Sequence, residues 1–244
     1  MPEQMLLSAI HERQPKIVAN EANDRDPKWP LHELMGVEIE TEDFAYANEV
    51  AEELHDYWTT HHDGSLRNGT EWVTRYPFAG KALTTAINMF FAKRRAYNMS
   101  ERTSTHIHIN MTDENLTLDQ FRSLFCLAFI IDPAVFRIAD ENRKWCSYCC
   151  PLTDMSEERL STLLSSDKKT RIMAAINGDK NEDKYYGFNV VSLRKHGTLE
   201  FRHFSCTQDK EQLESWIKLV QEIKKAGISF DNPKVMLEMM NTPD

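Results

Sequence analysis

The stretch Thr105-His106-Ile107-His108-Ile109-Asn110 decides the fold, because polar residues alternate in it with isoleucine. Side chains along a β-strand point to opposite faces in turn, so this pattern predicts a strand with one isoleucine face and one polar face. The polar face carries His106, His108 and Asn110, whereas a strand that only faces solvent usually mixes lysine, threonine and serine. We therefore expect this face to bind a metal ion or a phosphate group.

Two other segments alternate in the same way. Gly36-Val37-Glu38-Ile39-Glu40 places two glutamates on one face, and Thr198-Leu199-Glu200-Phe201-Arg202 places a glutamate and an arginine on one face. If the three strands lie side by side, their apolar faces form one wall of the core. Their other faces then form a field of carboxylates, imidazoles and a guanidinium.

The composition is ordinary for a globular protein and limits the possible functions. A chain of 244 residues with 41% hydrophobic and 27% charged residues can form one substantial domain or two small ones. The formal charge of -9 argues against broad electrostatic binding to nucleic acid. There is no apolar run long enough to span a bilayer, and the amino terminus lacks the pattern of a signal peptide. Five cysteines, an odd number, favour a cytoplasmic protein with reduced thiols.

We expect residues 1–33 to form a polar N-terminal extension, with a short helix around Met5–Ile10, and residues 34–244 to form a single domain. Strands come singly or in hairpins between helices, without the regular rhythm of a parallel α/β fold. The sequence therefore predicts an α+β fold, with a mainly antiparallel sheet and helices packed on one face.

Apolar spacing and capping patterns predict the individual elements. Helices are expected at 44–60, at 78–97, from 118 onward, in short pieces within 156–176, and from a Thr207 cap to a stop at Gly227. The helix from 118 follows a capping box at Thr117, and Pro133 should kink or divide it. A short strand at 71–74 and a hairpin of 186–194 with 198–204 complete the sheet.

The acidic pair Glu38 and Glu40 is the sharpest candidate for a site. Two carboxylates at neighbouring positions on one face repel each other unless a cation lies between them. Glu71 and Glu200 are further carboxylates on expected strands. Hard divalent cations such as Mg²⁺ prefer oxygen ligands. For any one of these glutamates an exposed sheet face is the simpler explanation, but the four together with the histidine strand favour a functional site.

A zinc site is the alternative, because His106 and His108 have the spacing of a bidentate pair on a strand. Zinc would need a third ligand, for which Glu200 or His203 is available. The many carboxylates favour an oxygen-rich Mg²⁺ site instead, with His108 bound to phosphate or metal.

Two other clusters have simpler interpretations. Cys146, Cys149 and Cys150 resemble half of a zinc knuckle or a redox pair, but without a second cysteine pair we interpret them as partly buried thiols in a loop. His61-His62-Asp63 is expected at the end of the helix at 44–60, where a protonated histidine complements the helix dipole. The sequence has no GxxxxGKS/T, GxGxxG, GxSxG or HExxH motif, which disfavours P-loop enzymes, Rossmann dehydrogenases, α/β-hydrolases and zinc proteases of that motif.

Taken in order, several short motifs resemble the amidoligases, a branch of the carboxylate–amine ligase group that shares the fold of glutamine synthetase and glutamate–cysteine ligase. The motifs are Gly-Val-Glu-Ile-Glu at 36–40, Asp-Gly-Ser with Gly-Thr-Glu-Trp-Val-Thr at 63–74, His-Ile-His-Ile-Asn at 106–110, Arg143 and Tyr148, Tyr-Gly-Phe-Asn at 186–189 and His-Gly-Thr-Leu-Glu-Phe-Arg at 196–202. The resemblance runs from about residue 36 to about residue 220.

The resemblance implies a curved antiparallel sheet whose polar face binds ATP and Mg²⁺. By motif position, Glu38 and Glu200 look like ligands of one ion, and Glu40 and Glu71 like ligands of another. The resemblance also implies roles for other residues: Arg202 neutralises the transferred phosphoryl group, Arg143 holds a substrate carboxylate or phosphate, His108 and His106 lie beside the phosphates, and Asn189 and Tyr186 line the site.

The implied reaction is ligation in two steps. ATP phosphorylates a small-molecule or peptide carboxylate, and an amine donor attacks the acyl phosphate to give an amide or peptide-like bond. Asp63 is a candidate for binding the incoming ammonium group. No membrane or nucleic-acid partner is expected. Two alternatives remain: a non-catalytic descendant that binds a nucleotide or a partner through the same sheet, and a zinc hydrolase built on His106 and His108.

Overall fold

The computed structural model of the chain describes Met5, Leu7 and residues 33–44, 47–93, 97–112, 115–178 and 183–241. Most of the expected N-terminal extension, including most of its predicted helix, lies outside the described residues. Within it, Leu7 is buried, and its backbone N–H donates a 2.8 Å hydrogen bond to the carbonyl of Leu116.

Six strands form one sheet, and every pair of neighbouring strands is antiparallel. Their order across the sheet is β2-β3-β1-β4-β6-β5. The strands are β1 (Met35–Glu42), β2 (Trp58–His62), β3 (Gly69–Thr74), β4 (Ser104–Asn110), β5 (Phe188–Asn189) and β6 (Thr198–Ser205). The predicted α+β class with an antiparallel sheet is therefore confirmed.

The apolar side chains of the central strands align across the sheet. Val37 of β1 is opposite Ile107 of β4, which is opposite Phe201 of β6, and all three are at most 1% exposed. The ring of Phe201 contacts the ring of Trp216 on the final long helix, at 6.4 Å between centroids. This face is thus the core wall, and the residues between these positions point away from that helix.

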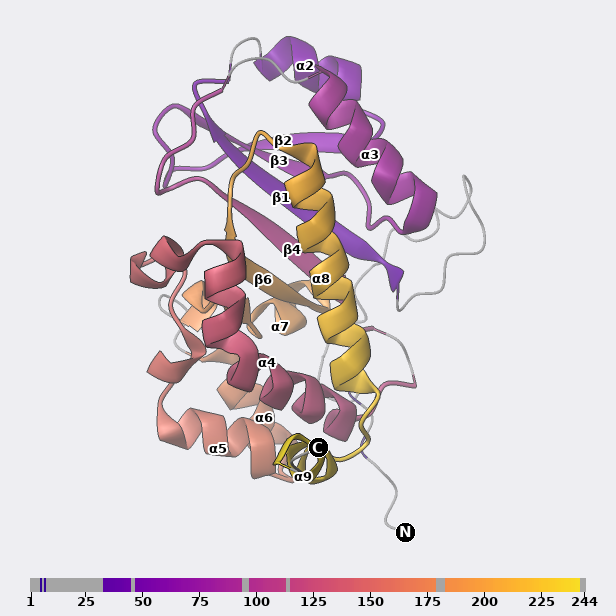
Figure 1. The fold of residues 1–244 in the computed structure, drawn as a ribbon, viewed down its shortest axis with the longest axis vertical. Helices are drawn as coiled ribbons and strands as arrows, with labels where there is room; N and C mark the ends of the chain where they lie inside the picture. Colours follow the sequence, from indigo (N-terminus) through magenta and orange to yellow (C-terminus); the bar gives the residue numbers. More distant parts are fainter. Residues whose placement is uncertain are drawn as a thin grey trace.

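The helices are α2 (Ala47–Leu54), α3 (Gly80–Lys93), α4 (Leu118–Ala139), α5 (Glu157–Ser165), α6 (Lys169–Asn177), α7 (Ser192–His196), α8 (Lys210–Ile228) and α9 (Pro233–Asn241), with short 3₁₀ turns η3 (Glu141–Trp145), η4 (Leu152–Asp154) and η5 (Asp183–Tyr185). In Figure 1, α8 crosses the front of the sheet, with α3 near the β2–β3 end and α4 near β6. The core therefore lies between the sheet and the layer of α3, α4 and α8.

The helix expected at 44–60 is shorter than predicted, since α2 ends at Leu54 and Trp58 begins β2. Trp58 fits the helical apolar spacing, but its buried indole N–H donates a 2.9 Å hydrogen bond to the carbonyl of Ala86 on α3. A tertiary contact fixes this residue, and the β-branched threonines after it suit a strand.

The expected hairpin of 186–194 with 198–204 forms only at Phe188 and Asn189. The Asn189 side chain accepts a 2.9 Å hydrogen bond from the Val191 N–H, which turns the chain out of the strand and into α7. Gly197, at φ 68°, caps α7 in the left-handed conformation that glycine adopts without strain.

The capping box at Thr117 is confirmed, because the Thr117 hydroxyl accepts from Gln120 N–H while the Gln120 side chain accepts from Thr117 N–H. Pro133 lies inside α4 without dividing it. Two details of α8 were predicted wrongly. Its N-cap is Asp209, and Gly227 lies within the helix instead of ending it.

Gly227 is required by close packing of α8 against α4, so we expect Gly227→Ala to lower the free energy of unfolding by about 1–3 kcal/mol. A Cβ at this position would lie 2.6 Å from the Leu124 Cα, a backbone atom that cannot move without displacing α4. Urea unfolding measures the effect. Gly64→Ala is the matched control, because nothing lies within 4 Å of its Cβ position. Equal stability of the two variants would contradict the prediction.

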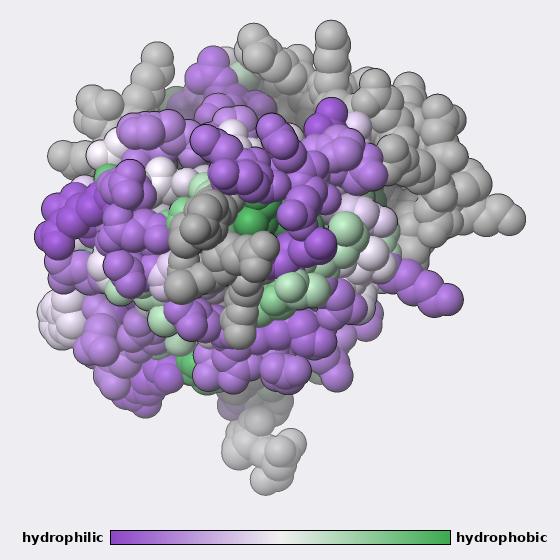
Figure 2. Space-filling model, turned by 90° about the horizontal axis from the view of Figure 1, so that it is seen from above, coloured by the Kyte–Doolittle hydropathy of each residue, from purple (hydrophilic) through white to green (hydrophobic). Residues whose placement is uncertain are grey.

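The described surface at the α2–α3 end is mostly hydrophilic, with only small areas of hydrophobic atoms (Figure 2). Within the described residues, no helix combines the length and the hydrophobicity that crossing a bilayer requires.

Candidate functional site

A cavity of about 690 Å³ lies over the polar face of the sheet. Most of the predicted site residues line it: Glu38, Glu40, Glu71, His106, His108, Asn189, Glu200 and Arg202. Its border comes from loops and from α7, which supply side chains such as Tyr148, Tyr185 and Lys195.

The strand register brings these side chains together. Directly opposite residues on antiparallel strands point to the same face. Glu40 of β1 is opposite Glu71 of β3, and His108 of β4 is opposite Glu200 of β6. Their partners on the outer strands extend the same polar row to both edges of the sheet.

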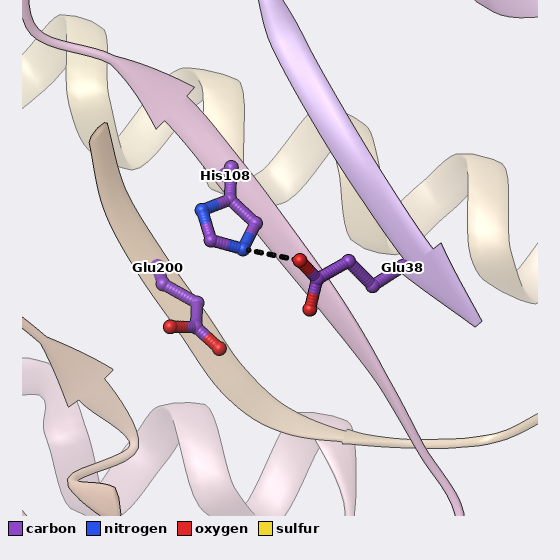
Figure 3. Close-up of side chains that lie close together, drawn as sticks. All are labelled: Glu38, His108 and Glu200. Atoms are coloured by element: carbon purple, nitrogen blue, oxygen red, sulfur yellow. Dashed lines mark ion pairs between the residues drawn. The ribbon is translucent and has the colours of Figure 1, made fainter. Parts of the chain in front are cut away.

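Glu38, His108 and Glu200 form the first cluster, with ligand atoms within 4.8 Å of one another (Figure 3). His108 Nε2 lies 3.1 Å from Glu38 Oε1, and the two groups form an ion pair. Its Nδ1 lies 2.9 Å from the Thr198 hydroxyl and 3.2 Å from the Ser192 hydroxyl, which fix the ring. The buried Nε2 is therefore held toward the two carboxylates.

Glu40, Asp63 and Glu71 form the second cluster, again with oxygens within 4.8 Å of one another. Glu40 accepts hydrogen bonds from the backbone N–H, at 2.8 Å, and the hydroxyl of Ser104. Asp63 accepts a 2.7 Å bond from Ser65 N–H, which fixes its turn. Three carboxylates at this distance are the ligand type that hard divalent cations prefer.

His106 connects the two clusters from beneath. Its Nδ1 lies 3.1 Å from Glu38 Oε2 and 3.3 Å from Glu200 Oε1, and its Nε2 lies 2.7 Å from the Ser104 hydroxyl. Both ring nitrogens thus already contact protein groups, and the side chain is only 2% exposed. His106 positions the carboxylates, whereas His108 is the histidine that belongs to a ligand cluster.

In the first cluster, the carboxylates and His108 each stabilise the charged form of the other. Burial raises the pKa of Glu38, but the charge of His108 and hydrogen bonds from both histidines hold that pKa well below 4.5. Burial lowers the pKa of His108, but Glu38 and Glu200 raise it to about 9. Burial raises the pKa of Glu200, which Arg202 and His108 nevertheless hold below its usual value. At neutral pH, without a ligand, the cluster contains two carboxylates and an imidazolium.

The second cluster lacks such compensation. Burial and repulsion by Glu38, Glu40, Asp63 and Glu200 raise the pKa of Glu71 to about 7. A cation bound here would relieve that repulsion and would displace the proton from Glu71.

Arg202 lies beside the first cluster in a fixed orientation. Its Nε donates a 3.2 Å hydrogen bond to the carbonyl of Tyr148, and its Nη1 donates to Glu200. Burial opposes its charge, but the carboxylates of Glu200 and Glu40 raise its pKa. The guanidinium is therefore a permanent positive charge at the cavity wall.

A family model described as "Putative amidoligase enzyme" matches residues 28–224, most of the chain and all of the strands described above. This chain belongs to the amidoligase family. No match was found among curated proteins or solved structures. The family indicates a ligase-type enzyme.

Arg143 and Tyr186 are not among the residues that line the cavity of this amidoligase. Arg143 is buried, and its Nη1 donates a 3.4 Å bond to the carbonyl of Thr103. The Tyr186 hydroxyl instead donates to the carbonyl of Asp154, at 3.4 Å.

The suggestion of His203 as a zinc ligand was wrong. His203 faces the helix layer, where its Nε2 lies 2.8 Å from a carboxylate oxygen of Asp132 on α4. The three clustered cysteines are free thiols, as interpreted from the sequence. The buried Cys149 donates a 3.2 Å hydrogen bond to the carbonyl of Arg202, and burial raises its pKa to about 11.

Sequence reasoning missed several residues of the cavity. His61 was placed at a helix end, yet it lies on β2 opposite Glu71. Arg102, Lys195 and His196 also line the cavity, from loops and α7. Loop residues follow no periodic pattern, so only the strand that begins at Trp58 had a usable signal, its β-branched threonines.

A smaller cavity of about 250 Å³ adjoins the first, since Glu38 and His108 line both. Arg75 and Tyr76, after β3, line its other side. The first cluster therefore lies where two cavities meet.

Proposed function

We propose that this amidoligase is an ATP- and Mg²⁺-dependent carboxylate–amine ligase, built on a sheet of the glutamine synthetase type. It joins a small-molecule or peptide carboxylate to an amine donor through an acyl phosphate. The observation that carries the proposal is the presence of two oxygen-rich clusters and the fixed Arg202 in one cavity. ATP and a carboxylate are both anionic, and their close approach requires positive charge, which Arg202 and cations held by these clusters would supply.

The donor sets fit Mg²⁺. Glu38 and Glu200 would hold one ion, with the His108 imidazolium beside it, and Glu40, Asp63 and Glu71 would hold a second. When bound, the ions supply charge neutralisation for the phosphate oxygens. The second set is wholly carboxylate, and excess negative charge at Glu71 favours a cation there.

Arg202 would act in the first step, the transfer of the phosphoryl group. The terminal phosphorus of ATP forms a bond to a carboxylate oxygen while its bond to the bridging oxygen breaks, and ADP leaves. Arg202, whose orientation is fixed by Tyr148 and Glu200, would stabilise the negative charge on the transferred group. In this proposal Arg202 and the cations held by the two clusters act together on one in-line transfer.

In the second step the donor loses a proton to solvent to become a neutral amine, its nitrogen attacks the acyl carbon, inorganic phosphate leaves, and the nitrogen loses a second proton to solvent. The acidic end of the cavity, around Asp63 and Glu71, favours a cationic amine donor as it arrives. The smaller cavity opens on Glu38 and His108, and it offers the carboxylate a separate approach to the phosphates.

A zinc hydrolase on His106 and His108 has less support. In the described part of the chain, the two histidines do not belong to one ligand cluster. Both ring nitrogens of His106 already contact protein groups, namely Glu38, Glu200 and Ser104. A non-catalytic descendant would bind nucleotide without turnover, and ADP release separates it from a ligase.

Thermal unfolding with a non-hydrolysable ATP analogue and MgCl₂ tests the proposal. At about 100 times the dissociation constant, the ligand should add roughly 2.7 kcal/mol, or roughly 5–10 °C in melting temperature. The shift should vanish when EDTA replaces MgCl₂. No shift with Mg²⁺, together with a shift given by Zn²⁺ alone, would refute the proposal in favour of the zinc site.

We expect the affinity for Mg²⁺ to fall about tenfold per pH unit as the pH drops below 7, and to level off above pH 8. The Glu71 pKa is raised to about 7, so below that pH the ion must displace its proton, whereas above it the carboxylate is free. Calorimetric titration with MgCl₂ at pH 6, 7 and 8 measures this. Glu71→Gln should bind more weakly but with little pH dependence. Constant affinity of the wild type over this range would contradict the assignment.

A further inference from the structure

Two tyrosines stand together on the border of the main cavity. Tyr148, from the loop after η3, and Tyr185, at the end of η5, both line it. Their ring centroids are 5.6 Å apart, with an interplanar angle of 78°. Both side chains are only partly buried, so their rings are accessible from the cavity.

Two cationic groups lie near the ring of Tyr185. The Lys184 ammonium lies 4.7 Å from the centre of the Tyr185 ring, and the Arg202 guanidinium carbon lies 5.9 Å from it. Lys184 also lines the cavity and is exposed, so its ammonium can leave the ring and follow an anion. The aromatic pair is therefore next to the guanidinium assigned above to the phosphates.

Tyr148 and Arg202 are also linked through the backbone, because the Tyr148 carbonyl accepts the Arg202 Nε–H at 3.2 Å. The Cys149 thiol donates to the Arg202 carbonyl at 3.2 Å. These two bonds fix the distance between the aromatic pair and the charged wall. A ligand that has a flat ring and an anionic chain would contact both.

We propose that Tyr148 and Tyr185 form the subsite that stacks the nucleobase of ATP, with Lys184 released toward the phosphate chain. The inference rests on the proposed function and adds to it the position of the base. Stacking on aromatic rings suits any base, because every base has a π-face. The ligand then extends from the tyrosines past Arg202 to the carboxylate clusters.

Binding of two probes, with and without a base, tests the subsite. A non-hydrolysable ATP analogue and inorganic tripolyphosphate, each with MgCl₂, are titrated calorimetrically into wild type, Tyr148→Leu, Tyr185→Leu and Tyr185→Phe. Stacking on one aromatic residue corresponds to roughly 5- to 150-fold in affinity. We expect each leucine variant to lose that factor for the ATP analogue and less than about twofold for tripolyphosphate. Tyr185→Phe, which retains the ring, should bind like the wild type.

Trp145→Leu is the matched control, since Trp145 is an aromatic residue of the same region that is 81% exposed and does not line the cavity. It should bind both probes unchanged, and melting temperatures of all variants verify that they fold. Equal losses for both probes, or no loss for either, would overturn the subsite while leaving nucleotide binding intact. Absence of binding in the wild type would instead refute the proposed function itself.

Discussion

Replacing Glu200 by glutamine should lower Mg²⁺-dependent ATP turnover by roughly 10²–10³-fold or more while the protein remains folded. Glu200 is 5% exposed and anionic, because Arg202 and His108 hold its pKa below the usual value against the effect of burial. It also accepts a 2.7 Å hydrogen bond from Asn189. Glutamine keeps the shape of the side chain but removes the charge that a cation in the first cluster requires.

The measurement is ADP release with a mixture of amino acids as carboxylates and hydroxylamine as a trap for acyl phosphates. Glu222→Gln is the matched control, since Glu222 is an exposed residue of α8 that pairs with Lys225. It should leave turnover unchanged. If both Glu200→Gln and Glu38→Gln retained wild-type turnover, the ligase mechanism on this sheet would be refuted.

The strand alternation made the polar face predictable. Side chains two residues apart on a strand share a face, so Glu38 with Glu40 and Glu200 with Arg202 could be paired from the sequence alone. The suggestion of His203 as a zinc ligand disregarded this period, which puts His203 on the face of Phe201, where the structure has it. What the period does not encode is which strands are neighbours, and their order was seen only in the structure.

The sequence did not indicate where tertiary contacts override local pattern. Trp58 fits both a helix and a strand, and its bond to the Ala86 carbonyl on α3 joins residues far apart in the chain. A bulge between β4 and β6 likewise has no sequence signal. Thr105 and Ile107 of β4 are opposite Phe204 and Phe201, so β6 carries one extra residue there. Both His203 and Phe204 consequently contact the ring of Trp216.

Loop residues of the site were the least predictable. Tyr186 belongs to a motif that implied a place in the site, but its hydroxyl bonds outside the cavity, and the preceding residue, Tyr185, lines the cavity instead. Loop side chains take their direction from turns and individual hydrogen bonds, for which no period exists. For the same reason the polar residues of the strands could be predicted from the sequence, while those of the rim could not.

Arg202→Lys should lower ATP turnover by about 10³-fold or more, the loss typical when an arginine that stabilises a transferred phosphoryl group is removed. The guanidinium bonds the Tyr148 carbonyl through Nε and Glu200 through Nη1, so its remaining N–H groups have a fixed direction. The lysine ammonium is a single point charge on a flexible stem and cannot make the same set of contacts. The substitution preserves the charge, and only the geometry changes.

The readouts separate binding from chemistry. In Arg202→Lys, the affinity for the ATP analogue with Mg²⁺ should fall much less than turnover, because the lysine still offers a positive charge to the bound phosphates. The oriented guanidinium, in contrast, acts mainly on the charge that develops during transfer. Arg137→Lys, on α4 and outside the main cavity, is the matched control and should leave both unchanged. Equal losses of affinity and turnover would assign Arg202 to ground-state binding. Turnover within about threefold of the wild type would remove Arg202 from the mechanism, and the neutralisation of charge would then rest on the two carboxylate clusters and their ions alone.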